Sequence, residues 1–195
     1  MQKLILIGGG GHCKSCIDVI EQEGKYLIEG ILDTQELLGN KLLNYTYIGV
    51  DGDIEKFVKQ DYAFLITVGQ IKTASVRQKI AQLLTQHHAR SATVVSPRAY
   101  VSAYANVDEG TIIMHDALIN ASATVGKHCI INTKALVEHD AQIQDFCHIS
   151  TGAIINGGAL IQKGTFLGSN ATSKEYVTSS QNDFIKAGTL FKGHR

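Results

Sequence analysis

Residues 125–167 read VGKHCI INTKAL VEHDAQ IQDFCH ISTGAI INGGAL IQKGTF L, and this stretch decides the fold. Every sixth residue from Val125 to Leu167 is aliphatic, and the same spacing extends back to Val95 without a break. All of these aliphatic residues except Leu167 are β-branched, and the residue four positions after each of them is Ala, Cys or Thr. A short repeat this regular predicts a solenoid, in which each turn of the chain buries its neighbour.

The six-residue period predicts a triangular coil, in which each hexapeptide forms one short strand and one corner. Three hexapeptides make a turn of 18 residues, and successive turns stack at the strand spacing of about 4.8 Å. The aliphatic residue fills the interior, so Cys129 and Cys147, 18 residues apart in the small-residue position, are expected to stack as interior filler. Asn, Gly or Asp often follows the aliphatic residue, as at Asn132 and Gly126, which indicates that the tight turn lies there. The repeat predicts a left-handed parallel β-helix.

The repeat falters near its C-terminal end. Ser173 and Ser179 occupy positions where the period calls for aliphatic residues, and the pattern returns at Ile185. We therefore predict an irregular or looser coil over residues 172–183, followed by a closing coil.

The N-terminal half has a different pattern, in which apolar runs alternate with amphipathic stretches. The pattern predicts strands over residues 3–7, 27–32, 45–50 and 62–68, and helices over residues 12–23, 75–88 and a short stretch that begins near Asp51 or Asp53. Gly24 is placed to end the first helix. Strands and helices alternating at this length predict a small parallel sheet of Rossmann-like type. We expect two domains, an α/β domain over residues 1–93 and the β-helix over residues 94–195.

The composition limits the partners and the location of the protein. Lys plus Arg and Asp plus Glu each number 18, so the formal net charge is zero. This balance argues against nucleic acid or an anionic membrane as a partner, since both attract a cationic face. The first apolar run is shorter than that of a signal peptide, and no segment is long enough to span a bilayer, which predicts a cytoplasmic protein.

Cysteine usage fits a reducing compartment. Cys13 and Cys16 form a C-x-x-C motif near the first helix, which is compatible with a thiol redox site. The alternative, which we favour, is that both side chains pack on that helix.

Histidines within the solenoid are the most informative polar residues, because its interior is aliphatic. They are His115, His128, His139 and His148, and any one of them could be an inert surface side chain. His139 differs because Asp140 follows it directly. A carboxylate beside an imidazole can fix its tautomer and raise its basicity, as a general base requires.

The glycine-rich loop Gly8–Gly11 precedes the first predicted helix. Backbone N–H groups at such a helix start form an anion site suited to a diphosphate, although a plain tight turn has the same composition. Asp33 ends the second predicted strand, where it can accept hydrogen bonds from a ribose or base, or simply cap the turn.

The whole chain resembles the sugar O-acyltransferases of the sialic-acid type. The resemblance rests on IGGGGH, GILD and FLITVG in the first half, and on INTKALVEHD, FCHISTGA and the hexapeptides in the second. Within that group the chain is most similar to the UDP-4-amino-sugar N-acetyltransferases of bacillosamine-type pathways. The resemblance implies a nucleotide-sugar substrate, acetyl-CoA as co-substrate, no metal, and a homotrimer with active sites between subunits.

The resemblance also implies roles for residues in the solenoid. His139 matches the catalytic base, Asp140 its acidic neighbour, and Asn132 the asparagine one coil face earlier. The positions that match acetyl-CoA contacts are His148, near the thiol end, and the backbone contacts Gly157 and Ser169.

In the N-terminal half, the resemblance implies substrate-binding positions. Gly10, Gly11 and His12 match the loop that approaches the phosphates, Asp33 matches an acidic residue near the nucleoside, and Gly69 matches the end of the third strand. The sequence departs from the family in its four-glycine loop, in residues 172–183 and in its LFKGHR end, which lacks the Gly-x-Pro-Ala-Lys tail. The last two lie where the adenine end of CoA is expected, so the resemblance implies no contacts there.

Together, the residues and the resemblance predict an enzyme that transfers acetyl from acetyl-CoA to the amine of a nucleotide-linked 4-amino sugar. O-acetylation of a sialic-acid-like sugar is the nearest alternative, since it would use the same base. A zinc enzyme of the γ-carbonic-anhydrase type shares the solenoid but needs converging histidines. His139 and His148 have no third histidine at the usual short spacing. A sensing or scaffolding protein is the remaining alternative, and the intact His139–Asp140 pair argues against it.

Overall fold

A computed structural model describes residues 1–193 and divides the chain into two compact units. One unit comprises Met1–Gly69 and Ser75–Val94, and the other comprises Gln70–Ala74 and Val95–Arg195. The short segment Gln70–Ala74 thus belongs to the solenoid, although its neighbours in sequence belong to the α/β unit. His194 and Arg195, the end of the LFKGHR sequence, lie outside the described residues.

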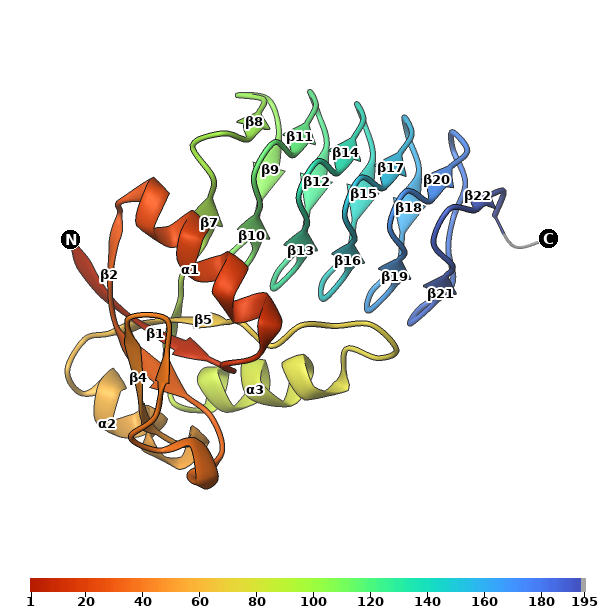
Figure 1. The fold of residues 1–195 in the computed structure, drawn as a ribbon. Coiled ribbons are helices and arrows are strands. Elements are labelled where there is room, and N and C mark those ends of the chain that lie inside the picture. The colour runs from red at the N-terminus through yellow and green to blue at the C-terminus, as the bar shows by residue number, and fades with distance from the viewer. Residues whose placement is uncertain (194–195) are drawn as a thin grey trace. The chain divides into compact units, whose positions relative to one another are not determined.

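The α/β unit contains a sheet with the strand order β3-β4-β2-β1-β5-β6 (Figure 1). Its strands are β1 (Gln2–Ile7), β2 (Tyr26–Leu32), β3 (Lys41–Leu42), β4 (Tyr45–Gly49), β5 (Ala63–Ile66) and β6 (Arg90–Ser91). All neighbouring pairs are parallel except β3 and β4. The central strand β1 is fully buried from Leu4 to Ile7, as the apolar run at the start of the sequence predicts. The predicted Rossmann-like sheet is confirmed.

Helices accompany this sheet at the predicted places. They are α1 (Gly11–Glu23), α2 (Ile54–Val58) and α3 (Ser75–Gln86), with short 3₁₀ turns η1 (Gln35–Leu37) and η2 (Asp51–Asp53). Gly24 ends α1 in the left-handed conformation, with φ 69° and its N–H donating to the Ile20 carbonyl at 3.0 Å. Substitution there would strain the backbone.

Two details of the sheet differ from the prediction. Strand β5 ends at Ile66 rather than at residue 68, because the Thr67 hydroxyl donates to the carbonyls of Ile7 and Gly8 and turns the chain away. Strand β3, which forms a hairpin with the predicted strand β4, and strand β6 were not predicted. Each has only two residues, which is too short to show a period in the sequence.

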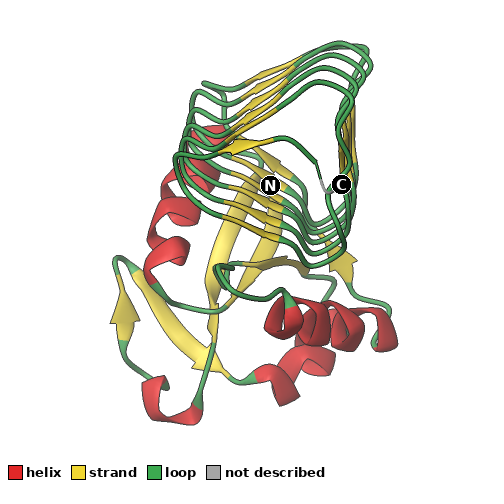
Figure 2. Cartoon of the chain, turned by 90° about the vertical axis from the view of Figure 1, so that its right-hand side faces the viewer, coloured by secondary structure: helices red, strands yellow, loops and turns green. Residues whose placement is uncertain are grey.

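The second unit is the predicted left-handed β-helix. Its short strands form three parallel sheets within the described residues, and the coils superimpose as a triangle when viewed along their stacking direction (Figure 2). The strands are β7 (Val94–Val95), β8 (Tyr100–Val101), β9 (Asn106–Val107), β10 (Ile112–Ile113), β11 (Leu118–Ile119), β12 (Thr124–Val125), β13 (Ile130–Ile131), β14 (Leu136–Val137), β15 (Gln142–Ile143), β16 (His148–Ile149), β17 (Ile154–Ile155), β18 (Leu160–Ile161), β19 (Phe166–Leu167), β20 (Thr172–Ser173), β21 (Phe184–Ile185) and β22 (Leu190–Phe191).

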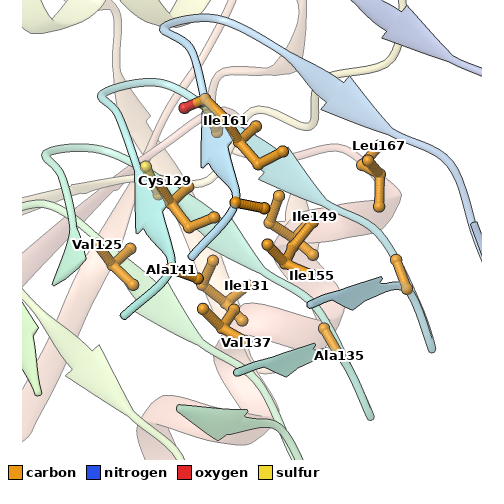
Figure 3. Close-up of a cluster of buried hydrophobic side chains, with 14 of the residues drawn as sticks. Val125, Cys129, Ile131, Ala135, Val137, Ala141, Ile149, Ile155, Ile161 and Leu167 are labelled. Carbon is orange, nitrogen blue, oxygen red and sulfur yellow. The ribbon is translucent and has the colours of Figure 1, made fainter. Parts of the chain in front are cut away.

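Register between coils follows the 18-residue turn. Ile131 pairs with Ile149, and Ile149 pairs with Leu167, so identical positions of successive coils lie side by side. The side chains of these residues meet in the interior, together with the small residues (Figure 3). Ile149 is 0% exposed, and so are Cys129 and Cys147, which confirms the prediction that these cysteines are interior filler. Burial raises the pKa of the Cys147 thiol well above its usual value, which suits an inert structural cysteine.

The tight turn lies elsewhere than the sequence suggested. Positive φ occurs three residues after the interior aliphatic residue, not one, at every corner from Gly110 to Gly188. Asp140 (φ 59°), His128 (φ 54°) and Phe146 (φ 58°) adopt it without being glycine. The preference for Asn, Gly and Asp directly after the aliphatic residue was therefore misinterpreted as marking the left-handed turn.

The sequence predicts an irregular or looser coil over residues 172–183, and the structure shows that these residues keep the phase of the solenoid, so the coil is not irregular. Ser173 and Ser179 occupy the interior positions and are 0% and 2% exposed. Their hydroxyls accept hydrogen bonds from the backbone N–H groups of Asn156 and Gln162, at 2.9 and 2.8 Å. Because the buried hydroxyls are satisfied, serine can replace an aliphatic residue. One face is looser, since a single bridge between Leu160 and Thr178 replaces a strand.

Candidate active site

His139 lies at the corner that follows β14, with its side chain 56% exposed. Its Nδ1 lies 2.8 Å from Oδ2 of Asp140. A carboxylate accepts hydrogen bonds, so Nδ1 carries the proton and Nε2 keeps its lone pair. The two adjacent side chains meet because Asp140 has the left-handed backbone of the corner. The pair has the arrangement that a general base requires.

The charges around His139 favour its protonated form. The hydrogen bond that His139 donates to Asp140 raises the pKa of His139, partial burial opposes this shift, and the charges of Asp140 and Glu138 raise the pKa further. Glu138 accepts a hydrogen bond from the Asn120 side chain at 2.8 Å and one from the His139 backbone N–H at 3.3 Å. The sequence did not single out Glu138, although it flanks His139 as closely as Asp140 does.

Gly157 lies one coil after His139 and beneath its ring. A Cβ atom added to Gly157 would lie 2.9 Å from both Cε1 and Nε2 of His139. Real Cβ atoms do not approach so closely without displacing their neighbours. Gly157 therefore provides the space that the His139 ring occupies, a role that the sequence did not suggest.

His148 and Asn132 lie together, but not with His139. Nδ1 of His148 donates to the backbone carbonyl of Gln70 at 2.6 Å, so Nε2 is the acceptor for the Asn132 amide at 3.1 Å. The Asn132 side-chain oxygen accepts the Thr133 N–H, which fixes the amide in this orientation. His148 is thus neutral, 7% exposed, and engaged at both ring nitrogens.

Gln70 completes this arrangement within the solenoid unit. Its side chain is 3% exposed and donates to the carbonyls of Phe146 and Gly164, at 2.9 and 3.2 Å. Ser169 lies on the same side of the coil, with its hydroxyl 3.0 Å from that of Ser150. The predicted solenoid residues therefore form two groups, one around His139 and Gly157 and the other around Asn132, His148 and Ser169.

The predicted substrate residues of the α/β unit lie around a cavity of about 550 Å³. Gly10, Asp33 and Gly69 line it, and Gly11 begins helix α1 beside it. The backbone N–H groups of Gly10 and Gly11 make no hydrogen bond within residues 1–193. His12 packs close to Gly69, where an added Cβ would lie 3.4 Å from the Cβ of His12. Two N–H groups at a helix start form a site for an anion.

Asp33 both holds the turn after β2 and lines the cavity. Its carboxylate accepts the backbone N–H groups of Gly9 and Thr34, which holds the glycine loop against the end of β2. The Tyr47 hydroxyl adds a hydrogen bond to the Gly9 carbonyl at 2.9 Å. The loop is therefore positioned before any ligand binds.

Arg77 was not predicted from the sequence and is 1% exposed. It lies on α3, where helical spacing suggests a surface residue, yet its guanidinium donates to the carbonyls of Ile66 and Val68 at 3.0 and 2.6 Å. Ile66 ends β5 and Val68 lines the cavity, so Arg77 fixes one wall of the cavity.

The C-x-x-C motif lacks the features of a redox site. Cys13 and Cys16 are both 0% exposed on α1, and burial raises the pKa of Cys13 to about 11 and that of Cys16 still further. Reactive cysteines have a lowered pKa, so both are packing residues.

Most of the α/β unit is similar to a known family of domains. Residues 3–84 match the family described as the PglD N-terminal domain. The cavity described above lies within the matched residues. No curated protein sequence matches the chain.

Solved structures resemble nearly the whole chain. The acetyltransferase domain of PglB from Neisseria gonorrhoeae is 26% identical, with a TM-score of 0.91, over 99% of this chain and 92% of that one. The same domain in complex with acetyl coenzyme A is 25% identical, with a TM-score of 0.89, over 98% and 94%.

A variant of perosamine N-acetyltransferase from Caulobacter crescentus, with one histidine replaced by asparagine, also matches. This protein, in complex with CoA and GDP-perosamine, is 26% identical, with a TM-score of 0.92, over 99% of this chain and 90% of that one. These matches confirm the predicted resemblance to sugar N-acetyltransferases and the predicted combination of an N-terminal Rossmann-like domain with a β-helix.

No three His, Cys, Asp or Glu side chains of the described chain are grouped so that they could hold a metal ion. Within the same residues, every helix is too short or too polar to cross a lipid bilayer.

Proposed function

We propose that this chain transfers the acetyl group of acetyl-CoA directly to the amine of a nucleotide-linked 4-amino-4-deoxy sugar. The observation that carries the proposal is His139, whose half-exposed ring donates its Nδ1–H to Asp140, so that Nε2 keeps its lone pair. The similarity to acetyltransferases that act on amino sugars supports the acyl donor and the class of acceptor.

In the proposed reaction the sugar amine attacks the thioester carbonyl and a new C–N bond forms. Nε2 of His139 takes a proton from the nitrogen, and Asp140 stabilises the resulting imidazolium. The C–S bond then breaks, and CoA leaves as a thiolate that accepts this proton. A backbone N–H would stabilise the oxyanion of the tetrahedral intermediate.

The α/β unit would hold the nucleotide part of the sugar. The N–H groups of Gly10 and Gly11 would bind the diphosphate at the start of α1. The resemblance of the sequence predicts UDP as the nucleotide that carries the sugar. The perosamine enzyme, by contrast, is in complex with GDP-perosamine. Both carriers present the same diphosphate to these glycines.

Assembly into a trimer would account for the two groups of solenoid residues. His139 and Gly157 follow strands of one sheet, while Asn132, His148 and Ser169 belong to another. We propose that His139 of one subunit faces acetyl-CoA held along a neighbouring solenoid. The second group would then line the cofactor site from the neighbour, with Gln70 and His148 keeping that wall rigid.

The experiment that tests the function is an acceptor panel assayed for CoA release. UDP-, GDP- and dTDP-linked 4-amino sugars are compared with the matching 4-hydroxy sugars and with free sialic acid. We expect release of CoA only with a 4-amino nucleotide sugar. Turnover of free sialic acid or of the 4-hydroxy sugars would instead establish O-acetylation, and absence of turnover throughout would contradict both activities.

Replacing Asp140 by asparagine should shift the pH dependence of the reaction. The base must be unprotonated, so kcat/KM falls as the pH drops through the pKa of His139. Asp140 raises that pKa, so its loss should move this acidic limb to lower pH. The weaker base should also lower the plateau at high pH. A profile of kcat/KM against pH that keeps its acidic limb unmoved would contradict the role of Asp140.

Gly157→Ala should disturb catalysis with little effect on folding. The added methyl group meets the His139 ring at 2.9 Å and must displace it, and a misplacement of about 1 Å can lower a rate about 100-fold. Ala121 and Ala103 hold the same position two and three coils earlier, so the backbone accepts alanine there. We expect kcat to fall more than tenfold while the melting temperature stays within a few degrees. A fall in melting temperature that matched the loss of activity would show a general structural defect.

A further inference from the structure

The cavity of the α/β unit has side-chain acceptors but few side-chain donors. Its walls are apolar side chains, contributed by Ile7, Leu32, Val50, Val68, Val76 and Ile80. Among the residues that line it, the charged side chains are Asp33 and Asp51, and the hydroxyl of Thr34 is the one side-chain donor. A ligand that presents flat apolar faces and N–H groups fits such a cavity.

The two carboxylates differ in what they can offer a ligand. Asp33 already accepts the N–H groups of Gly9 and Thr34. Asp51 lies on the turn η2, and its side chain makes no hydrogen bond or ion pair within residues 1–193. Desolvation and the nearby charge of Asp33 raise the pKa of Asp51. A hydrogen bond donated by a ligand would therefore stabilise Asp51 more than Asp33.

The nucleobases differ in the donors they could bring to Asp51. Guanine presents N1–H and the 2-amino group side by side, and a carboxylate can accept both through its two oxygens. Uracil has a single N3–H between two carbonyl oxygens. Placing that N–H on Asp51 brings both carbonyls toward negative charge, in a cavity that supplies few side-chain donors to offset them.

We propose that Asp51 makes this cavity selective for guanine, so that the sugar is carried by GDP rather than UDP. The side chains of Val76 and Ile80 on α3 would contact a face of the base, and Asp51 would accept its two donors. This inference rests on the proposed function for the sugar. The choice of base can nevertheless be measured with nucleotides alone, without any acetyl transfer.

Titration calorimetry on the full chain with GDP, UDP, dTDP and IDP tests the inference. Hydrogen bonds to a charged group contribute enough that GDP should bind at least about tenfold more tightly than UDP or dTDP. IDP has the same ring but lacks the 2-amino group, so its affinity should lie between those of GDP and UDP. This comparison uses the unchanged protein, so it does not depend on whether a variant folds.

The same calorimetry on the Asp51→Asn variant provides a second test of the inference. The amide keeps the size of the side chain but presents one acceptor and one donor, so GDP should bind about tenfold more weakly while UDP binds as before or better. Glu55→Gln is the matched control, because Glu55 lies in the same segment but is paired with Lys59 outside the cavity. That control should bind both nucleotides like the unchanged protein.

Two results would overturn the inference. One is UDP binding as tightly as GDP to the unchanged protein, and the other is an equal loss of both nucleotides in Asp51→Asn. Failure of the proposed function would look different. In that case GDP would bind with the expected preference, but no 4-amino sugar would release CoA from acetyl-CoA.

Discussion

His139→Ala is expected to lower kcat about 10²–10⁴-fold, the contribution of a positioned general base. The loss should appear mainly in kcat, because Nε2 contacts the amine during proton transfer rather than holding either substrate. The ring lies on the solenoid surface, with its side chain 56% exposed, so its removal opens no interior cavity. Steady-state kinetics with acetyl-CoA and a saturating amino-sugar acceptor measures this effect.

A matched control separates the base from general effects of removing a histidine. His87 lies after α3 in the other unit and is assigned no role, so His87→Ala should retain the activity of the unchanged protein. If His139→Ala retained full activity as well, the assignment of the base would be wrong, whatever the acceptor.

Ile149→Asp should unfold the solenoid or destabilise it by more than about 4 kcal/mol. Ile149 is 0% exposed and pairs with Ile131 on one side and Leu167 on the other. A carboxylate there would have neither water nor a cation as partner. Because each coil is buried by its neighbours, damage at this central position should spread along the stack.

Denaturant unfolding followed by circular dichroism measures this loss. Ile149→Val is the matched control, since it removes one methylene group and should lower the free energy of unfolding by only about 0.5–1.5 kcal/mol. If the aspartate variant were as stable as the valine variant, the account of the interior given above would be wrong.

The solenoid could be predicted because its physics is local and repeated. Each aliphatic residue must face the same interior, so the period of six appears directly in the sequence, and Cys129 and Cys147 could be assigned as filler from their position alone. Buried serines are harder to predict. Ser173 and Ser179 look like interruptions in the sequence, because the backbone N–H groups that satisfy them come from the preceding coil.

The site could be predicted only where neighbours in sequence are neighbours in space. His139 and Asp140 are adjacent, and the sequence identified them as a pair. Gln70 bonds to His148, which lies 78 residues away, and nothing in the sequence signals that contact. The same holds for Asp51, whose importance depends on a cavity formed by several separate loops.

The most direct test of the central claim is the chemical identity of the acetylated product. The protein is incubated with acetyl-CoA and a nucleotide-linked 4-amino sugar, and the product is analysed by NMR spectroscopy. The proposed reaction predicts one acetyl group joined by an amide bond to the nitrogen at C4, formed in equal amount with free CoA. An ester on any hydroxyl group, or an acceptor that remains unmodified while CoA is released, would contradict it.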